Sequence, residues 1–407
     1  MLIFPIRITY NEICDLDRKG ARDLHRHILS YGCFVLSLLI LFMTGASLLT
    51  SAKFVPTDVP LPTVSAQSAI LLEADNRQIV YEKNAHIPLP MASTTKIMTA
   101  IVALESADPA MAVTVTADAV GIEGSSIYLY EGEVLSLEHL LYALLLESAN
   151  DAAMAIAIAV SGTEEAFVSL MNQKATSLGL MNTHFTNPHG LDHENHYTSA
   201  SDLAILAAYC MQNESFRAIV STQRMTIPLD DQEGVRLLLN HNRLLRSYKG
   251  TIGLKTGFTK RSGRCLVSAA ERDGVMLIAV TLNAPDDWDD HKSLLDYGFS
   301  QFRSVLLQSQ GSYTRAVPLI GMQQSSVEIY NRSEVRVTLP QSHGDIQMIC
   351  QAPRWLSGTI FEGQTLGYLV WYCDNEIIAT APLIARSTIP LQTGKKSWWS
   401  RLRLLFT

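Results

Sequence analysis

The sequence predicts the α+β fold class, with an antiparallel sheet and a cluster of helices followed by a small all-β sandwich. Strand-like apolar runs occur near both ends of residues 65–310, and helical patterns fill the stretch between them. After about residue 311 only short strand-like runs with polar turns remain, which is typical of a sandwich. The 407 residues are enough for more than one such domain.

The first domain is expected to open with a β-hairpin. Residues 69–72 and 78–81 are short apolar runs on either side of an Asp-Asn pair, the pattern of two strands joined by a turn. Pro88 and Pro90 then interrupt the chain. The mostly apolar residues 93–104 follow, and they predict a buried helix.

The middle of this domain is expected to be helical. Residues 135–158 have the apolar spacing of a helix, with an interruption near 147–150. Ser199 and Asp202 resemble a capping box that would open a further helix. The chain would then return to the sheet and end the domain with a helix, in the ranges 251–257, 265–270, 275–282 and 291–302.

The second domain is predicted from short strand-like runs among which no convincing helical pattern occurs. These runs are residues 327–330, 335–339, 346–350, 366–372 and 377–381. The patterns together divide the chain into a leader (1–52), a linker (53–64), a first domain (65–310), a β-domain (311–388) and a tail (389–407).

The composition is that of a folded, mildly acidic protein. Hydrophobic residues make up 47% and charged residues 17%, which is too apolar for a disordered chain. The net charge of -7 argues against a broad nucleic-acid surface, so no nucleic-acid partner is expected. No motif indicates a metal or an organic cofactor, and neither is expected.

The cysteines give no sign of a metal or redox motif. They are Cys14, Cys33, Cys210, Cys265, Cys350 and Cys373, and no two form a CxxC pair. Buried free thiols are the favoured interpretation, because a chain of this size can build a core without disulfides. A bridge between Cys350 and Cys373 stays open, because both lie in the small second domain.

The leader has the pattern of an export signal. Residues 31–49 carry no charge, and basic residues precede them at Arg18, Lys19, Arg22 and Arg26. Small residues before Lys53 would allow a signal peptidase to cleave after Ala52. The alternative is a retained signal anchor, because the run is about as long as the roughly 20 apolar residues that span a bilayer. Either case places the rest of the chain outside the cytoplasm.

The tail is expected to bind a membrane surface. Trp398, Leu402 and Leu405 share one helical face, with basic residues on other faces. Tryptophan with Lys and Arg suits the headgroup layer of an anionic membrane, although the segment is too short to span it. The alternative is a frayed, adhesive chain end.

Three short motifs carry the chemistry of the first domain. In chain order they are Ser93-x-x-Lys96, Ser148-x-Asn150 and Lys255-Thr256-Gly257. Ser-x-x-Lys alone is close to chance in a chain this long, whereas all three in this order and in these contexts are a specific signal. The alternative, in which Ser93 only caps a helix and Lys255 is a surface charge, is disfavoured.

Ser93 is the candidate nucleophile and Lys96 its candidate base. One helical turn separates them, so they share a face. A serine hydroxyl is a weak nucleophile until a base takes its proton. Lys96 can be that base only if its pKa is lowered, which burial and a second cation such as Lys255 would both achieve.

The other motif residues would bind substrate and move protons. Ser148 is expected to pass a proton to the leaving amine, and Asn150 to hold the amide on the acyl side of the substrate. Lys255 and Thr256 are expected to bind a substrate carboxylate.

Backbone groups would complete the site. Gly257 would let the backbone approach the substrate closely. The backbone N–H groups of Ser93, at a helix start, and of Phe258 would form an oxyanion hole.

At these motifs the chain resembles the D-alanyl-D-alanine carboxypeptidases, the low-molecular-mass penicillin-binding proteins with a serine nucleophile. The likeness runs from about Ser65 to the C-terminus, and one departure is Ala149, where the family often has glycine. Segments outside the motifs carry it as well, at residues 141–147, 151–153, 187–191, 197–200, 240–245, 250–259 and 361–367.

The resemblance implies a serine β-lactamase/DD-peptidase-like first domain at the extracytoplasmic face of a bacterial membrane. It implies removal of the terminal D-alanine from the peptidoglycan stem pentapeptide through an acyl-enzyme at Ser93, which water then hydrolyses. β-Lactams would acylate the same serine and stay bound. The family also commonly has a signal peptide and an amphipathic C-terminal anchor.

Three other interpretations compete with this one. A β-lactamase of the same fold is one, but the Glu-x-x-Leu-Asn string of class A enzymes is absent. A catalytically silent wall-binding or scaffold protein is another, and the intact motifs weigh against it. The crowded His189, His193 and His196 invite a metal, but Pro188 and Gly190 predict a solvated loop without an HExxH motif.

Overall fold

The computed structural model describes residues 59–229, 234–322 and 324–390. The predicted leader and the tail from residue 391 lie outside the described residues. In the part of the chain that the structure describes, no single helix has the length and apolarity to cross a membrane. Among the described helices, the length and apolarity of a membrane span are reached only by a pair taken together, Asn150–Ser161 and Glu164–Ser177, which are bent by 87°.

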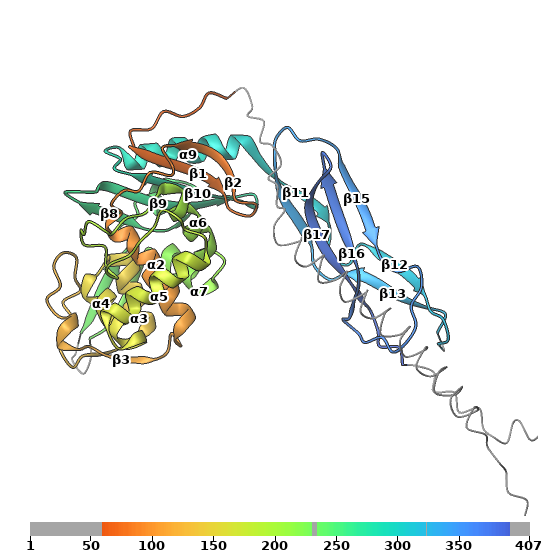
Figure 1. The fold of residues 1–407 in the computed structure, drawn as a ribbon, viewed down its shortest axis with the longest axis horizontal. Helices are drawn as coiled ribbons and strands as arrows, with labels where there is room; N and C mark the ends of the chain where they lie inside the picture. Colours follow the sequence, from red (N-terminus) through yellow and green to blue (C-terminus); the bar gives the residue numbers. More distant parts are fainter. Residues whose placement is uncertain (1–58, 230–233, 323, 391–407) are drawn as a thin grey trace, which may run out of the picture. The chain divides into compact units, whose positions relative to one another are not determined.

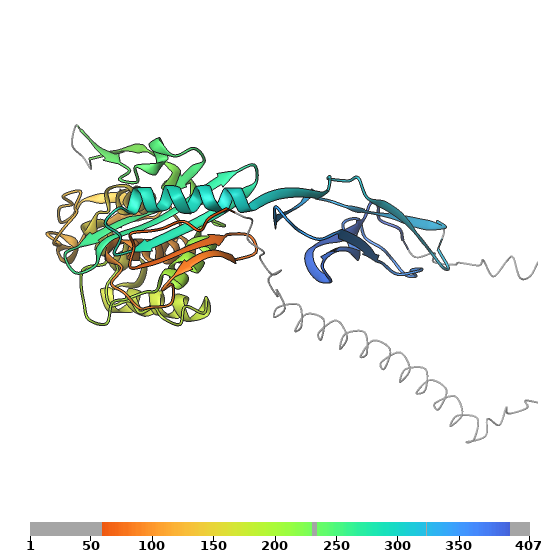
Figure 2. The ribbon, with the colours of Figure 1, turned by 90° about the horizontal axis from the view of Figure 1, so that it is seen from above.

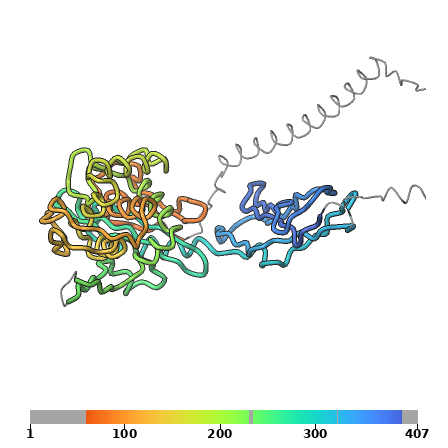
Figure 3. The backbone as a smooth tube through the Cα atoms, turned by 90° about the horizontal axis from the view of Figure 1, so that it is seen from below, coloured from red at the N-terminus to blue at the C-terminus, as the bar shows by residue number. Residues whose placement is uncertain are grey.

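The first domain is built on one antiparallel sheet drawn from both ends of the domain. The strand order is β2-β1-β10-β9-β7, and β8 also pairs with β9. Figure 3 shows the first strands of the described chain beside the strands that close the domain. Their bounds are β1 Ser68–Glu73, β2 Gln78–Lys83, β7 Thr251–Gly253, β8 Thr256–Thr259, β9 Gly263–Arg272 and β10 Val275–Leu282. The predicted hairpin and the predicted sheet are confirmed.

A cluster of helices covers one face of the sheet and α9 covers the other (Figure 1). The helices are α2 Lys96–Ser106, α3 Leu137–Tyr142, α4 Asn150–Ser161, α5 Glu164–Ser177, α6 Ala200–Cys210, α7 Glu214–Ser221, α8 Leu244–Ser247 and α9 Asp287–Gln301. Figure 2 shows α9 running along its face of the sheet.

The side-chain alternation of β1 explains the two layers. Successive side chains of a strand point to opposite faces. Leu71 accordingly packs with Leu294 and Leu295 of α9, whereas Ile70 and Leu72 join the core of the helical cluster. All six residues of β1 are buried, because both faces of the strand are covered.

The helix expected from Ser93 begins one residue earlier, as the 3₁₀ turn η1 Ala92–Thr95, and continues as α2. The predicted interruption near residues 147–150 is also confirmed. There the π-helical turn η3 Ala143–Glu147 ends at Ser148, whose φ of 63° is left-handed. A left-handed non-glycine residue breaks a helix, so α4 restarts in a new direction at Asn150.

The predicted capping box is half confirmed. Ser199 caps α6, because its hydroxyl accepts from the backbone N–H of Asp202 at 3.1 Å. The Asp202 carboxylate accepts instead from the backbone N–H of Asn182 at 2.7 Å. It therefore ties α6 to the loop that precedes it in the chain.

Short elements border the helical cluster. They are η2 Ala117–Ala119, the ribbon of β3 Ala112–Thr114 with β4 Val134–Ser136, and the ribbon of β5 Arg224–Pro228 with β6 Val235–Leu239. The predicted strand over 251–257 is divided, because Gly253 and Leu254 have positive φ values of 134° and 88°. This break separates β7 from β8.

The C-terminal part is all-β, as predicted. β11 Phe302–Gln308 pairs with β14 Val335–Pro340. The other sheet has the order β12-β13-β17-β16-β15, with bounds Thr314–Pro318, Ser326–Asn331, Glu376–Ala385, Thr365–Cys373 and Ile346–Gln351. Its core includes Val317, Ile329, Leu369, Trp371 and Leu383.

The four described cysteines are free thiols. Cys210, Cys265 and Cys373 are buried, which confirms the favoured interpretation for them. Cys350 pairs with Leu369 and Cys373 with Ile346, so the two cysteines lie on neighbouring strands but not opposite each other. The bridge between them that the sequence left open is not formed.

Candidate active site

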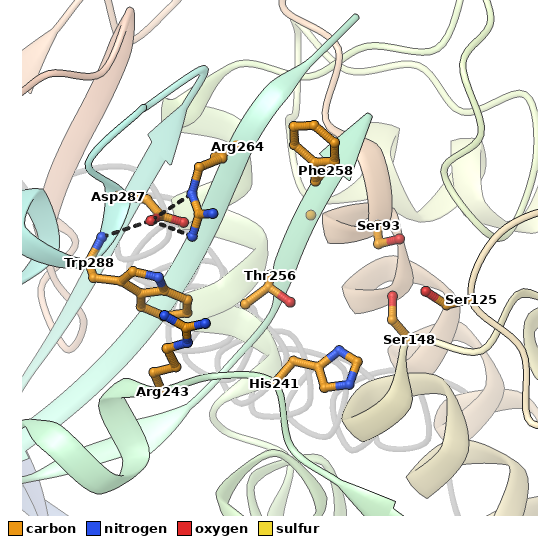
Figure 4. Close-up of a pocket in the computed structure, with 11 residues that line it drawn as sticks. Ser93, Ser125, Ser148, His241, Arg243, Thr256, Phe258, Arg264, Asp287 and Trp288 are labelled. Atoms are coloured by element: carbon orange, nitrogen blue, oxygen red, sulfur yellow. Dashed lines mark hydrogen bonds and ion pairs between the residues drawn. The ribbon is translucent and has the colours of Figure 1, made fainter. Parts of the chain in front are cut away.

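A cavity of about 340 Å³ opens beside β8. Figure 4 shows Ser93 and Ser148 on one side of it and the side chains of β8 on the other. It is lined by Ser93, Ser125, Ser148, His241, Arg243, Thr256, Gly257, Phe258, Arg264, Asp287 and Trp288. Residues of all three sequence motifs therefore meet at one cavity.

Ser93 lies on η1 and is the one partly exposed residue of an otherwise buried stretch from Met91 to Ala100. Ala92, directly before it, has a φ of 48°, which is uncommon for a residue with a Cβ. This left-handed residue turns the chain into the helix and leaves the Ser93 hydroxyl facing the cavity (Figure 4).

Lys96 is fully buried behind Ser93. Its Nζ lies 3.1 Å from Ser93 Oγ, 2.6 Å from Asn150 Oδ1 and 2.6 Å from the carbonyl oxygen of His189. Burial lowers the pKa of Lys96 well below its usual value, and the nearby Lys255 lowers it further, while Asp151 opposes the shift. A neutral amine is therefore favoured at this position.

The three partners of Lys96 suit a neutral amine. Such an amine has two N–H donors and one lone pair. The Asn150 and His189 oxygens can only accept, so they take the two donors. The lone pair is left for the Ser93 hydroxyl, which can donate to it. The arrangement is that of a base hydrogen-bonded to a nucleophile.

Asn150 is held in a fixed orientation. Its Nδ2 donates to the carbonyl oxygen of Glu123 at 2.5 Å, which leaves Oδ1 facing Lys96. Its backbone N–H donates to the carbonyl oxygen of Ser125 at 2.7 Å. Both bonds attach the loop over the cavity to the start of α4.

Asp151 fixes the same loop from inside. Its buried carboxylate accepts from Ser126 Oγ at 2.6 Å and from the backbone N–H groups of Ile127 and Leu129. Ala149, where the family often has glycine, has an ordinary φ of -63° and a buried methyl group in the core. The methyl group is thus accommodated away from the cavity.

The register of β8 turns two backbone N–H groups towards the cavity side. Lys255 and Val267 exchange both backbone hydrogen bonds, at 3.0 and 2.9 Å. Such pairs alternate along an antiparallel ladder, so Gly257 pairs in the same way with its partner on β9. The N–H groups of Thr256 and Phe258 then point to the free edge of β8, away from β9. The Phe258 N–H can belong to the predicted oxyanion hole only if it points away from β9 in this way.

The free edge of β8 lies against the start of the nucleophile helix. A Cβ added to Gly257 would lie 3.1 Å from Ala92 Cβ and 3.1 Å from the Ser93 backbone nitrogen. These distances are shorter than ordinary van der Waals contact, so a side chain there would push β8 and the nucleophile segment apart by a few tenths of an ångström. The predicted close backbone approach at Gly257 is therefore found, and it is an approach to residues 91–93 at the start of the helix that carries Ser93.

Lys255 is buried directly before β8, and its Nζ donates to the carbonyl oxygen of Thr256 at 2.9 Å. Burial lowers the pKa of Lys255 to about 7, with Glu147 opposing the shift. Lys255, Lys96 and Asn150 therefore form the buried back of the site, and the other predicted residues line the cavity.

The structure adds side chains that the sequence did not single out. His241 and Arg243 line the cavity, and they fell within a segment that resembled the family. Arg264 forms an ion pair with Asp287, with Nη2–Oδ1 at 2.8 Å. The guanidinium carbons of Arg243 and Arg264 each lie 5.9 Å from the ring centroid of Trp288. No local sequence signal marks Arg264 and Trp288, because α9 and β9 come together only in the fold.

The loop with the crowded histidines is a loop, as predicted, but the expectation that it is solvated is wrong for two of them. His189 and His196 are 7% and 3% exposed. The Asn187-Pro188-His189-Gly190 turn packs against α2, where Thr99 Oγ1 donates to the carbonyl oxygen of Pro188 at 2.5 Å. Burial lowers the pKa of both histidines to about 3.

A serine and a buried lysine on one helical turn, facing a Lys-Thr-Gly strand across a cavity, define a serine acyl-enzyme of the penicillin-binding class. The chain belongs to the D-alanyl-D-alanine carboxypeptidase family, whose model matches residues 55–286. A model of the C-terminal domain of penicillin-binding protein 5 matches residues 302–391. The family predicted from the sequence is confirmed.

Individual relatives agree with this assignment. The chain is 33% identical to D-alanyl-D-alanine carboxypeptidase DacF of Bacillus subtilis (strain 168), over 79% of this chain and 85% of that protein. Penicillin-binding protein 5 of Haemophilus influenzae superposes with a TM-score of 0.63 at 27% identity, over 82% of this chain and 99% of that one. The Streptomyces K15 DD-transpeptidase superposes with a TM-score of 0.57 at 32% identity, over 60% of this chain and 100% of that one.

Proposed function

We propose that this chain is a serine D-alanyl-D-alanine carboxypeptidase that removes the terminal D-alanine from the peptidoglycan stem pentapeptide. One observation carries the proposal: the buried Lys96 amine has two carbonyl acceptors and the Ser93 hydroxyl as its partners. In the neutral amine, which burial favours, these carbonyls take both N–H donors and the lone pair is left for the Ser93 hydroxyl. Family membership supplies the substrate class.

In the acylation step neutral Lys96 takes the proton of Ser93 Oγ. The oxygen then forms a bond to the carbonyl carbon of the penultimate D-alanine. Negative charge collects on the carbonyl oxygen, which the backbone N–H groups of Ser93 and Phe258 stabilise. This requires the direction of the Phe258 N–H that the register of β8 supports.

The C–N bond breaks next, and D-alanine leaves as an amine after it receives a proton. Ser148 passes this proton from Lys96 to the leaving nitrogen. Figure 4 shows the Ser148 side chain pointing towards Ser93 at the cavity wall. Water then attacks the ester, Lys96 takes the proton of the water, and Ser93 Oγ is protonated again.

The carboxylate of the leaving D-alanine is bound from the β8 side. Thr256 and Arg243 line the cavity, and the buried Lys255 amine donates to the Thr256 carbonyl oxygen at 2.9 Å. An anionic group there meets several donors and positive charge.

Asn150 is proposed to position Lys96 as well as to hold the substrate amide, the role expected from the sequence. Its Oδ1 accepts from Lys96, and one N–H of its Nδ2 donates to the Glu123 carbonyl oxygen. The second N–H of Nδ2 is left for the carbonyl oxygen of a substrate amide, which can bind without displacing either of these bonds.

The test is release of D-alanine from a diacyl-L-Lys-D-Ala-D-Ala peptide. Wild-type protein is expected to release it, Ser93→Ala to release none, and the C-terminal amide of the same peptide to react at least about tenfold more slowly because it lacks the carboxylate. Release by Ser93→Ala would contradict the proposal. Rapid turnover of penicillin, in place of a long-lived adduct, would favour the β-lactamase alternative.

We also propose that the protein works at the extracytoplasmic face of the bacterial membrane. The uncharged run after a basic flank supports export, and the Trp- and Arg-containing tail supports surface attachment. Deleting residues 395–407 is expected to release the signal-cleaved protein into the soluble fraction. Unchanged sedimentation with membranes would count against the tail as an anchor.

A further inference from the structure

His196 is a buried side chain to which the proposed chemistry assigns no role. It is 3% exposed, and its ring packs edge-on against Phe185 at a centroid distance of 5.8 Å. A buried imidazole needs partners for both ring nitrogens, because an unpaired polar atom in the core is costly. The identity of those partners shows what the ring does.

The hydrogen bonds fix the tautomer of His196. The backbone N–H of Thr186 donates to Nδ1 at 3.0 Å, so Nδ1 carries no proton. The proton of the neutral ring is therefore on Nε2, which lies 2.7 Å from Thr95 Oγ1. The Thr95 hydroxyl accepts from the ring and donates its own proton to the Ala92 carbonyl oxygen at 2.8 Å.

This chain of bonds ends at the Ala92 carbonyl, which belongs to the same peptide unit as the Ser93 N–H. The Ala92 C=O and the Ser93 N–H belong to one planar peptide and point in opposite directions. Whatever fixes the carbonyl also fixes the direction of the Ser93 N–H. Ala92 has a φ of 48°, so the peptide needs support from its surroundings.

We propose that His196 is a positioning residue that acts through Thr95 to hold the Ala92–Ser93 peptide, and so aims the Ser93 N–H at the oxyanion. The inference rests on the proposed function, since it takes Ser93 as the nucleophile. An oxyanion exists only in the transition state and the tetrahedral intermediate. The effect of losing the positioning should therefore fall on the rate of acylation and not on the binding that precedes it.

Paired substitutions separate this role from general packing. His196→Gln keeps a donor within reach of Thr95, whereas the shorter His196→Asn keeps only the acceptor for Thr186. Thr95→Val removes the hydroxyl at nearly constant shape, and Thr95→Ser keeps it. His193→Asn is the matched control, because His193 is an exposed residue of the same loop.

The measurement is stopped-flow acylation of the full chain by a fluorescent penicillin, which yields a dissociation constant and an acylation rate constant. His196→Asn and Thr95→Val are expected to lower the rate constant about 10- to 100-fold with the dissociation constant within about threefold of wild type. His196→Gln, Thr95→Ser and His193→Asn should stay within about fivefold of wild type. The double variant His196→Asn/Thr95→Val should acylate no more slowly than the slower of the two single variants. Each substitution alone already breaks the same chain of hydrogen bonds.

Several results would overturn the inference. One is an equal loss of acylation rate in His196→Gln and His196→Asn. Another is weaker binding of penicillin with an unchanged acylation rate constant. A third is a double variant in which the effects of the two substitutions on the rate constant multiply. If His196→Asn does not fold, the comparison of Thr95→Val with Thr95→Ser decides the same question. Failure of the proposed function would look different, since wild-type protein would then carry no adduct on Ser93.

Discussion

Gly190 offers a test of how closely the loop 187–191 sets the nucleophile. Its φ is 93°, and a Cβ added there would lie 2.1 Å from the Ala92 carbonyl oxygen, a backbone atom. That is about 1.3 Å closer than the 3.4 Å at which ordinary contact begins, so the loop or Ala92 must move. Because Ser93 follows Ala92, a shift of about 1 Å in Gly190→Ala should slow acylation roughly 100-fold.

Gly162→Ala is the matched control for this substitution. Gly162 has a similar φ of 86°, but nothing lies within 4 Å of the added Cβ. Both variants take on about 1–2 kcal/mol of left-handed strain. This should lower the Tm of each by roughly 2–8 °C in a domain of this size.

Acylation by a fluorescent penicillin and thermal unfolding, measured on the same samples, separate strain from displacement. Gly162→Ala should lose stability and keep its acylation rate, whereas Gly190→Ala should lose both. An acylation rate of Gly190→Ala within about threefold of wild type would refute the idea that this loop holds the nucleophile in place.

Further predictions concern stability and pH. Arg236→Met should lower the free energy of unfolding, measured in urea, by about 3–5 kcal/mol, because it leaves the fully buried Glu133 carboxylate without its ion pair. Adding Glu133→Gln should recover part of this loss. An unchanged urea midpoint in Arg236→Met would contradict the prediction. The buried His291 has a pKa of about 3, so the unfolded state takes up a proton below about pH 6.5 that the folded state does not. Stability should thus fall with decreasing pH by up to about 1.4 kcal/mol per pH unit for this residue, and His291→Gln, if it folds, should flatten the slope. The pKa of Lys255 is about 7, so its charge is lost above that pH. The kcat/KM for a peptide with a free carboxylate should then fall above pH 7 relative to that for its amide, and parallel profiles would argue against Lys255 as a carboxylate partner.

Local features of the chain were predictable from the sequence because their causes are local. The hairpin of β1 and β2 follows from alternation and a turn, and the break at Ser148 from an interrupted helical spacing. The motif residues could be found because their spacing is set within one turn or one strand. The family followed from the same short segments.

The partners of these residues were not predictable, because the fold supplies them from far along the chain. Lys96 meets Asn150 and the His189 carbonyl, 54 and 93 residues away. The Arg264–Asp287 pair and Trp288 reach the cavity only when α9 packs beside β9. Sequence spacing contains no information on such contacts.

The loop around His189 shows a second limit. Histidine, aspartate and glutamate in close succession indicate a solvated segment, and the exposed members behave that way. His196 does not, because its two nitrogens are satisfied by Thr186 and Thr95 and can therefore be buried. Burial of a polar side chain depends on partners that only the folded chain brings together.

The measurement that tests the central claim most directly is the site of the covalent adduct. Wild-type protein, Ser93→Ala and Lys96→Met would be incubated with penicillin, digested, and mapped by mass spectrometry. We expect one penicilloyl group on the peptide that contains Ser93 in wild type, none in Ser93→Ala, and an adduct that forms about 100- to 10,000-fold more slowly in Lys96→Met, the range for loss of a general base. An adduct on another residue, or formation at the wild-type rate without the Lys96 amine, would contradict the account.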